Sequence, residues 1–240
     1  MNKYIKLILA SLTALTLSVG IAVAETKFGF GIIGSATEFT TVGSETEGPN
    51  GDSSDASEVT NATHSHDADY ASFFIEYSGG SAGGMSIAVG IEHVPGDASI
   101  GAKSRTDADN GDDNTSEADT GTYTAKAEVS DFTTLYIEPG YMFNDYFTVY
   151  GKLGVSTLTV TSLESIANGS TSSTYGNDEI FGGMYGAGVK VSTPMGAFFK
   201  LEATVQEFES VTLESTTGNL NTIHADPEAE SVRLALGWAF

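Results

Sequence analysis

The sequence has no cysteine, few basic residues and only five prolines among its 240 residues. A chain without cysteine has no disulfides, so it must be stabilised by a large hydrogen-bonded scaffold or by its solvent. Ten lysines and arginines against 32 acidic residues give a net charge of −22. We expect no nucleic-acid partner, because phosphates require basic groups to neutralise them.

Long hydrophobic runs are also scarce, and the one extended run lies at the N-terminus. Two lysines precede the mainly apolar residues 7–21, and the small-residue sequence AVA ends at Ala24. This order is typical of a cleaved secretory signal peptide at residues 1–24, with an uncleaved membrane anchor as the alternative. Elsewhere no apolar run approaches the roughly 20 residues that a spanning helix requires. The remaining chain is therefore soluble or meets a membrane without helices.

Alternation of apolar with small or polar residues is what the sequence has in abundance. In the last ten residues, SVRLALGWAF, every second residue is large and apolar: Val232, Leu234, Leu236, Trp238 and Phe240. Because the side chains of a strand alternate between two faces, this segment predicts a strand with one apolar face. Abundant glycine and aromatic residues also favour strands and turns over helices, and no window shows helical spacing.

Apolar alternation recurs in eight segments, which we expect to be eight strands. Their approximate ranges are 27–39, 70–78, 85–95, 122–143, 146–161, 181–192, 197–211 and 231–240.

Short and long connectors alternate between these segments. The short ones, at 79–84, 144–145 and 193–196, have the composition of hairpin turns. The long ones, near 41–69, 96–121, 162–180 and 212–230, are rich in acidic and small polar residues. An up-and-down sheet places alternate connectors at opposite ends. All long loops therefore belong to one end, and all short turns and both strand termini to the other.

The faces opposite the apolar ones carry most of the charged residues. We expect these residues to form an ion-pair network: Lys27, Glu76, Glu92, Lys126, Glu128, Glu138, Lys152, Lys190, Lys200, Glu202 and Arg233. In a membrane barrel they must point inward, since each Lys or Arg that faced lipid near mid-bilayer would cost roughly 2–4 kcal/mol. Glycines interleaved with them would make room in a narrow interior.

A soluble barrel or sandwich also alternates, but the placement of aromatic residues argues against it. One belt is expected at the short-turn end: Phe28, Tyr77, Tyr141, Phe143, Tyr146, Phe147, Phe198, Phe199, Trp238 and Phe240. Aromatic rings collect at membrane–water interfaces in this way. A second, looser belt is expected at the other end: Phe39, Tyr70, Tyr123, Phe132, Phe181 and Phe208. We therefore predict an all-β, eight-stranded antiparallel up-and-down transmembrane β-barrel, formed by residues 25–240.

These features together resemble the OmpA/OmpX/opacity-protein group of small bacterial outer-membrane barrels. The resemblance covers nearly the whole chain after residue 24, and its most specific part is the last strand, which ends on Phe240. In that family such a strand is a C-terminal signal that the barrel assembly machinery reads, and it closes the barrel against the first strand. The resemblance implies an outer-membrane location, with periplasmic termini and extracellular long loops. No peptidoglycan-binding domain follows the barrel, so no wall-anchoring role is inherited.

A barrel of eight strands is about wide enough for its side chains to fill. We therefore expect a non-enzymatic surface protein without catalytic residues, cofactors or a specific metal site. A narrow porin-like channel for small solutes or ions is the alternative, and an outer-membrane enzyme is a third class. Expected partners are outer-membrane lipid and lipopolysaccharide, the assembly machinery and, at the acidic loops, divalent cations attracted by the field of the carboxylates.

Four histidines are the candidates for chemistry. His64 and His66 flank Ser65 in an expected loop, beside Asp67 and Asp69, where they could act as a base or hold a metal. No family spacing matches this arrangement, so we interpret it as a solvated loop. His93 at a strand end is interpreted as an interfacial side chain.

Overall fold

The computed structural model describes residues 25–80 except 47–58, residues 83–107, 121–167 and 174–216, and residues 222–240. The expected signal peptide, residues 1–24, lies outside the described residues. Among those described, no helix is long and apolar enough to cross a membrane. Ten strands are present: β1 (Glu25–Thr46), β2 (Val59–Gly80), β3 (Met85–His93), β4 (Ala98–Asp107), β5 (Gly121–Asn144), β6 (Phe147–Ala167), β7 (Thr174–Ser192), β8 (Ala197–Phe208), β9 (Val211–Glu214) and β10 (Thr222–Ala239).

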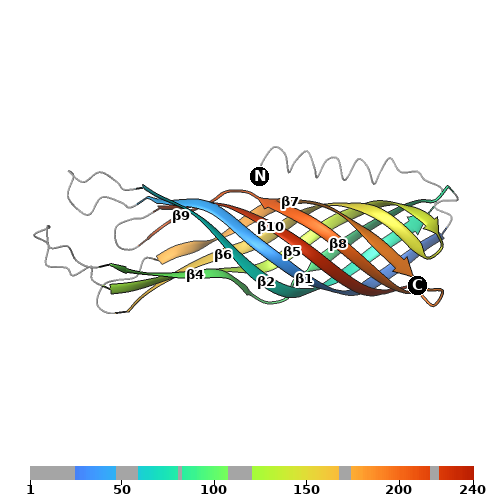
Figure 1. The fold of residues 1–240 in the computed structure, drawn as a ribbon, viewed down its shortest axis with the longest axis horizontal. Helices are drawn as coiled ribbons and strands as arrows, with labels where there is room; N and C mark the ends of the chain where they lie inside the picture. Colours follow the sequence, from blue (N-terminus) through green and yellow to red (C-terminus); the bar gives the residue numbers. More distant parts are fainter. Residues whose placement is uncertain (1–24, 47–58, 81–82, 108–120, 168–173, 217–221) are drawn as a thin grey trace, which may run out of the picture.

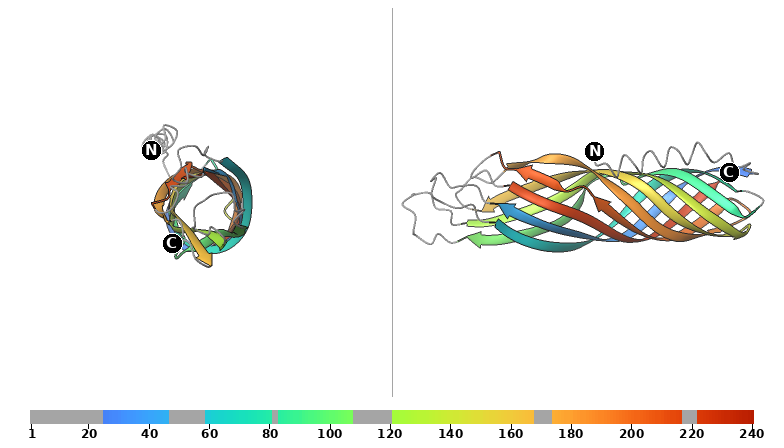
Figure 2. Two further views of the ribbon diagram at one scale, coloured as in Figure 1. Left: turned by 90° about the vertical axis from the view of Figure 1, so that its left-hand side faces the viewer. Right: turned by 90° about the horizontal axis from the view of Figure 1, so that it is seen from above.

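The strands form one antiparallel sheet that closes on itself as a long cylinder (Figures 1 and 2). Neighbouring strands follow the order β1-β2-β3-β5-β6-β7-β8-β10, and β1 pairs with β10 from Gly29 opposite Ala239 to Thr46 opposite Thr222. Both β3 and β4 pair with β5, and both β8 and β9 pair with β10, so these two pairs each act as one interrupted strand. The predicted eight-stranded up-and-down barrel is therefore confirmed.

Three short turns lie at one end of the cylinder, which we call the turn end. They join β2 to β3, β5 to β6 and β7 to β8. In the second, the Asn144 side chain accepts hydrogen bonds from the backbone N–H groups of Tyr146 and Phe147, each at 2.9 Å. Asn favours turns because its side chain bonds the backbone in this way. The chain enters β1 and leaves β10 at the same end (Figure 1).

The strands are much longer than the sequence predicted, and they extend into all four expected long loops. β1 and β2 pair continuously over 22 residues, whereas a membrane-spanning strand needs about 9–11. The expected loop from 41 to 69 is therefore wrong over most of its described part. Its residues are polar on their outer side, so they lack the apolar alternation by which the other strands were found.

Towards the other end, which we call the loop end, the ring of backbone hydrogen bonds is incomplete. β2 pairs with β3 only as far as Phe73 opposite His93, and β7 pairs with β8 only as far as Gly182 opposite Phe208. Within the described strands, no ladder joins β4 to β2 or β9 to β7. The wall of the loop-end half therefore has two seams.

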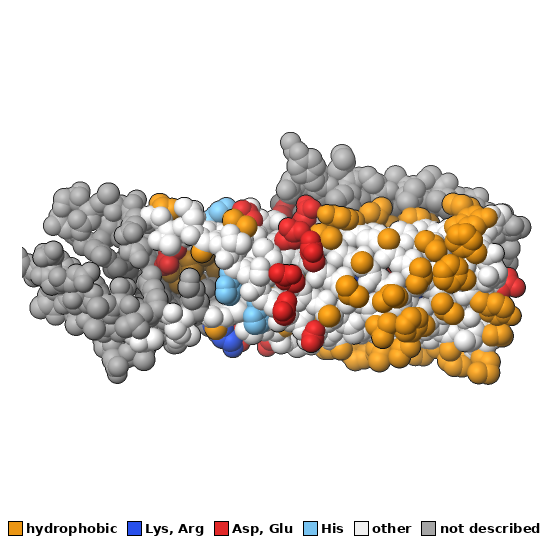
Figure 3. All heavy atoms as spheres, viewed as in Figure 1, with side chains coloured by type: hydrophobic (Ala, Val, Ile, Leu, Met, Phe, Trp, Pro, Cys, Tyr) orange, Lys and Arg blue, Asp and Glu red, His pale blue; other side chains and the backbone are white. Residues whose placement is uncertain are grey.

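The outer face of the turn-end half is apolar. Figure 3 shows hydrophobic side chains gathered over this half, with a row of carboxylates at its edge. Leu234, Leu201 and Leu153 are about half exposed there, as expected of side chains that face lipid. At the edge, Glu38 lies directly opposite both Asp67 and Glu230 in the ladders. We call this row the acidic girdle, and it comprises Glu38, Asp67, Asp69, Glu207, Asp226, Glu228 and Glu230, all exposed.

The inner face changes character along the cylinder, as β6 shows most clearly. Its inward side chains run from Lys152 through Ser156 to Leu158 and Val160, all buried. Apolar side chains thus face outward in the turn-end half and inward in the loop-end half. The loop-end interior is a buried apolar cluster of Val94, Val129, Phe132, Leu158, Val160, Tyr175, Ile180, Val211 and Leu213.

This reversal makes the expected second aromatic belt wrong for four of its six residues. Phe39 and Phe132 are buried inside the barrel, and Tyr70 and Phe208 pack against the interior cluster. In the first belt, Phe198 is also interior, where it packs against Phe74 with ring centroids 6.0 Å apart. Other predicted members of the first belt, such as Trp238 and Tyr141, are exposed on the outer face.

Replacing Leu234 with lysine tests the orientation of the outer face. The charge would face hydrocarbon, so we expect the free energy of unfolding in lipid vesicles to fall by about 2–4 kcal/mol. Val42→Lys is the matched control, because Val42 is just as exposed but lies opposite Asp226 at the loop-end edge of the acidic girdle, and it should change stability by no more than about 0.5 kcal/mol. Equal losses in a denaturant titration of the two variants would contradict a lipid-facing Leu234.

Candidate functional site

The interior of the turn-end half holds a cluster of charged side chains drawn from almost every strand of the ring. Each lies on the inward parity of its strand, opposite the lipid-facing residues. The contributors are Glu76 of β2, Glu92 of β3, Glu138 of β5, Lys152 of β6, Lys190 of β7, Lys200 and Glu202 of β8, and Arg233 of β10. Because residues this far apart in sequence converge, closure of the barrel creates the site.

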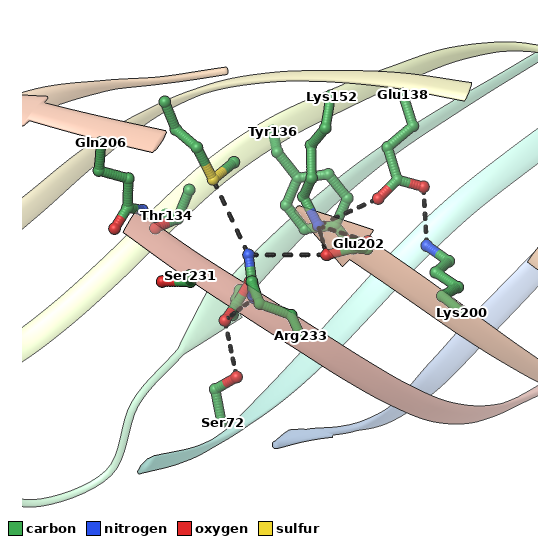
Figure 4. A network of polar contacts seen from close by, with 12 residues as sticks. Ser72, Thr134, Tyr136, Glu138, Lys152, Lys200, Glu202, Gln206, Ser231 and Arg233 are labelled. Atoms are coloured by element: carbon green, nitrogen blue, oxygen red, sulfur yellow. Dashed lines mark hydrogen bonds and ion pairs between the residues drawn. The ribbon is translucent and has the colours of Figure 1, made fainter. Parts of the chain in front are cut away.

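The eight charges form one continuous chain in which cations and carboxylates alternate. Its order is Lys190, Glu76, Lys200, Glu138, Lys152, Glu202, Arg233, Glu92. The successive N···O distances are 2.9, 2.5, 2.7, 3.1, 3.1 and 3.7 Å, and Arg233 then contacts Glu92. Figure 4 shows the middle of this chain, where Lys152 lies between Glu138 and Glu202. We call it the ion-pair chain.

The ion-pair chain is buried, so its charges must balance one another for the fold to be stable. The side chains of Lys152, Lys200, Glu76 and Glu202 are at most 2% exposed. A buried charge is costly unless it is paired and hydrogen-bonded. Four cations and four carboxylates balance one another, so the interior carries no net charge in this layer.

Aromatic and hydroxyl groups complete the site, and the sequence prediction did not single them out. The Tyr150 hydroxyl donates to Glu202 at 2.7 Å, and the Ser72 hydroxyl donates to Glu92 at 2.6 Å. The Lys152 ammonium lies 4.0 Å from the centroid of the Tyr136 ring. Tyr136 and Tyr150 each precede a network residue by two positions, and this spacing is the signal that could have identified them.

Two of the interleaved glycines provide the space for these rings. A Cβ at Gly90 would lie 2.4 Å from the Tyr136 hydroxyl, and one at Gly188 would lie 2.6 Å from that of Tyr150. Side chains at these positions would displace the rings. Glycine therefore makes room in the narrow interior at both Gly90 and Gly188, as expected.

A layer of hydroxyl and amide groups separates the ion-pair chain from the apolar cluster towards the loop end. Thr134 and Ser156 share a hydrogen bond of 2.9 Å, and Gln206 donates to Ser156 at 3.2 Å. Thr37 and Ser231 share another, of 2.8 Å. On the turn-end side, Ile33, Phe74, Phe198 and Ala235 form a second apolar cluster. The described part of the barrel interior is therefore arranged in successive layers.

Comparison with known protein families decides what kind of molecule this is. Residues 7–240 match the family model described as an outer membrane protein beta-barrel domain. The chain belongs to this family. No curated protein matches the sequence significantly.

Solved structures of outer-membrane barrels resemble this family member only in outline. Ail from Yersinia pestis is 11% identical, with a TM-score of 0.33, over 85% of this chain and 98% of its own. OprG from Pseudomonas aeruginosa is 14% identical, with a TM-score of 0.36, over 88% and 96%. The protease OmpT from Escherichia coli is 12% identical, with a TM-score of 0.43, over 89% and 97%. Similarities this low carry no argument about function.

Three of the residues expected in the network lie elsewhere in this outer-membrane barrel. Lys27 is exposed at the turn end, opposite Ser78. Lys126 and Glu128 contact each other and not the ion-pair chain, with side chains 44% and 28% exposed.

The expected inward orientation of Lys126 and Glu128 is wrong because β5 contains a bulge. Asp131 has a φ of 54°, and the register with β6 shifts between Ser130 and Thr133. A bulge adds one residue and reverses the parity that follows. Val129 is consequently buried, and Lys126 and Glu128 belong to the opposite face.

His64 and His66 do not form a site with the acidic residues that follow them, whereas His224 lies 3.9 Å from Asp226, with both side chains exposed. His64 and His66 lie on β2 and not in a loop, and Asp67 and Asp69 occupy the other face of the same strand. His93 forms a hydrogen bond of 2.9 Å with Thr133 at the end of β3. Among the described residues, no group of three or more histidines and carboxylates is arranged to hold a metal ion.

The predicted C-terminal signal lies on the lipid-facing side of the closing strand. Val232, Leu234, Leu236, Trp238 and Phe240 are all 44% exposed or more. The backbone of Phe240 also exchanges two hydrogen bonds of 3.0 Å with Phe28, so the last residue is tied to the first strand.

Neutralising one member of the ion-pair chain tests its importance for stability. Glu202→Gln would leave Lys152 and Arg233 with too few negative partners, and breaking a buried pair costs about 3–5 kcal/mol of unfolding free energy. Glu128→Gln is the control, because its exposed pair with Lys126 contributes at most about 1 kcal/mol. Denaturant titration in the same lipid vesicles provides the comparison. Losses of similar size would mean that the ion-pair chain is not structurally important.

Proposed function

We propose that this outer-membrane barrel is a closed, non-enzymatic surface protein that presents its long-loop end to other molecules. The ion-pair chain is the observation that supports this proposal most directly. It crosses the interior from β7 through β2, β8, β5 and β6 to β10 and β3. Ions that entered this layer would have to displace buried charges from their partners, which is energetically costly.

The proposed orientation places both strand termini in the periplasm and the long loops outside the cell. The short turns, the start of β1 and the end of β10 share one end, which supports a common compartment for them. In this proposal Val232, Leu234, Leu236, Trp238 and Phe240 are the signal that the barrel assembly machinery reads during insertion. The same strand then closes the ring against β1, so that no open strand edge faces lipid.

Outer-membrane lipid and lipopolysaccharide are the proposed partners of the outer surface. The acidic girdle follows the edge of the apolar half, where lipid headgroups would lie (Figure 3). Like charges directly opposite each other in a ladder, such as Glu38 and Glu230, repel. The field of the acidic girdle would attract divalent cations. These cations would relieve the repulsion and would bridge the carboxylates of the girdle to anionic headgroups.

Planar-bilayer recordings test whether the interior is closed. We expect the wild-type barrel to produce no stable, reproducible ionic steps at neutral pH. The double variant Lys152→Ala, Glu202→Ala removes a neutral pair from the middle of the ion-pair chain and should produce measurable steps. The variant Lys126→Ala, Glu128→Ala removes a pair on the other face of β5 and should remain silent. Stable wild-type steps would overturn the proposal and favour a narrow channel.

The non-enzymatic part of the proposal is tested separately. We expect purified barrel in lipid vesicles to hydrolyse neither peptide nor phospholipid substrates above the background of empty vesicles. His66→Ala and His93→Ala should therefore behave as the wild type does, since neither belongs, among the described residues, to a group of three or more side chains that could hold a metal ion. Wild-type hydrolysis that either substitution abolishes would establish an enzyme instead.

A further inference from the structure

The loop-end interior contains a cavity of about 230 Å³ inside the apolar cluster. Its walls come from nine strands of the sheet, all except β3, and include Phe39, Val129, Leu158, Ile180 and Leu213. Nearly all of its lining is apolar, whereas the ion-pair chain occupies the other half of the barrel. A cavity in this position is not required by the closed-barrel proposal.

The size and lining of the cavity distinguish it from ordinary core packing. Protein interiors pack as densely as organic crystals and contain few voids larger than a water molecule. An engineered cavity of about 150 Å³, lined by Leu, Ile and Phe, stays dry and binds benzene. The cavity here is larger and mainly apolar in its lining, although it is partly open, so an apolar molecule could supply contacts that its wall atoms lack.

We propose that this cavity is a binding site for a small, uncharged, apolar molecule, of the size of one aromatic ring or a short hydrocarbon chain. A cationic ligand is disfavoured, because the lining holds no carboxylate to be its partner, and the one cation of the lining, Lys126, is already paired with Glu128. Thr41, His64 and Ser162 supply polar groups at the wall, so a ligand with a single polar group also fits.

The surrounding structure supports a separate site with its own access. The hydrogen-bonded layer of Thr134, Ser156 and Gln206 lies between the cavity and the ion-pair chain. Both short strands, β4 and β9, line the cavity, and these are the strands that border the two seams. The cavity therefore lies where the fewest backbone hydrogen bonds hold the barrel wall.

Binding of fluorobenzene, followed by ¹⁹F NMR with the barrel in lipid nanodiscs, tests the proposal. We expect a protein-bound resonance distinct from that of fluorobenzene dissolved in the lipid. Ala127→Phe and Ala225→Phe fill the cavity from β5 and β10, and each should abolish that resonance. Ala187→Phe, on the exposed face of β7, adds the same group outside the cavity and should preserve it. Heat-modifiable gel mobility verifies that each variant is folded.

The absence of a bound resonance with the wild-type protein would overturn the proposal. So would a resonance that persists in both folded cavity-filling variants, since the ligand would then bind elsewhere. Xenon pressurisation of wild-type crystals gives a reading that does not depend on any variant. An anomalous peak between Leu158 and Leu213 is expected, and its absence would also contradict the site.

Discussion

The structure depends on one constraint: a single cylinder is surrounded by hydrocarbon over one half and by water over the other. Side chains alternate along every strand, so whichever kind faces outward forces the other kind inward. In the turn-end half the apolar residues face lipid, and Lys152 and Glu202 are enclosed. In the loop-end half Leu158 and Val160 are enclosed, and the outer face is polar. The acidic girdle marks the level at which the surroundings change (Figure 3).

Charge balance then determines how the turn-end interior is filled. Buried ions are tolerated only when they are paired, and a closed ring lets strands that are remote in sequence supply the partners. Lys200 of β8, for example, contacts both Glu76 of β2 and Glu138 of β5. Alternation of sign along the ion-pair chain gives every interior charge at least one opposite neighbour. The ion-pair chain therefore fixes the relative positions of the strands in the turn-end half. It also explains how a narrow barrel can enclose so many charges.

The sequence predicted the membrane-facing half well because lipid demands strict alternation there. The eight segments, the three short turns and the inward parity of Glu138, Lys152 and Arg233 all follow from that pattern. Prediction failed where the outward-facing side chains change from apolar to polar. The strand extensions beyond residue 41 of β1 and before residue 70 of β2 are polar outside, so they were interpreted as loops. The bulge at Asp131 reversed the parity of Lys126, and the local sequence did not predict this bulge.

By itself the sequence determined which residues share a face of each strand outside the bulge of β5, because that depends only on a period of two. It therefore determined the barrel class, the lipid-facing surface and most of the charged residues that are enclosed. Only the tertiary structure decided which charges meet, since pairing depends on register and on closure between β1 and β10. It also decided that the loop-end half of the same cylinder has a polar outer face and an apolar interior. That outcome requires the height of each residue along the cylinder, which no local pattern encodes.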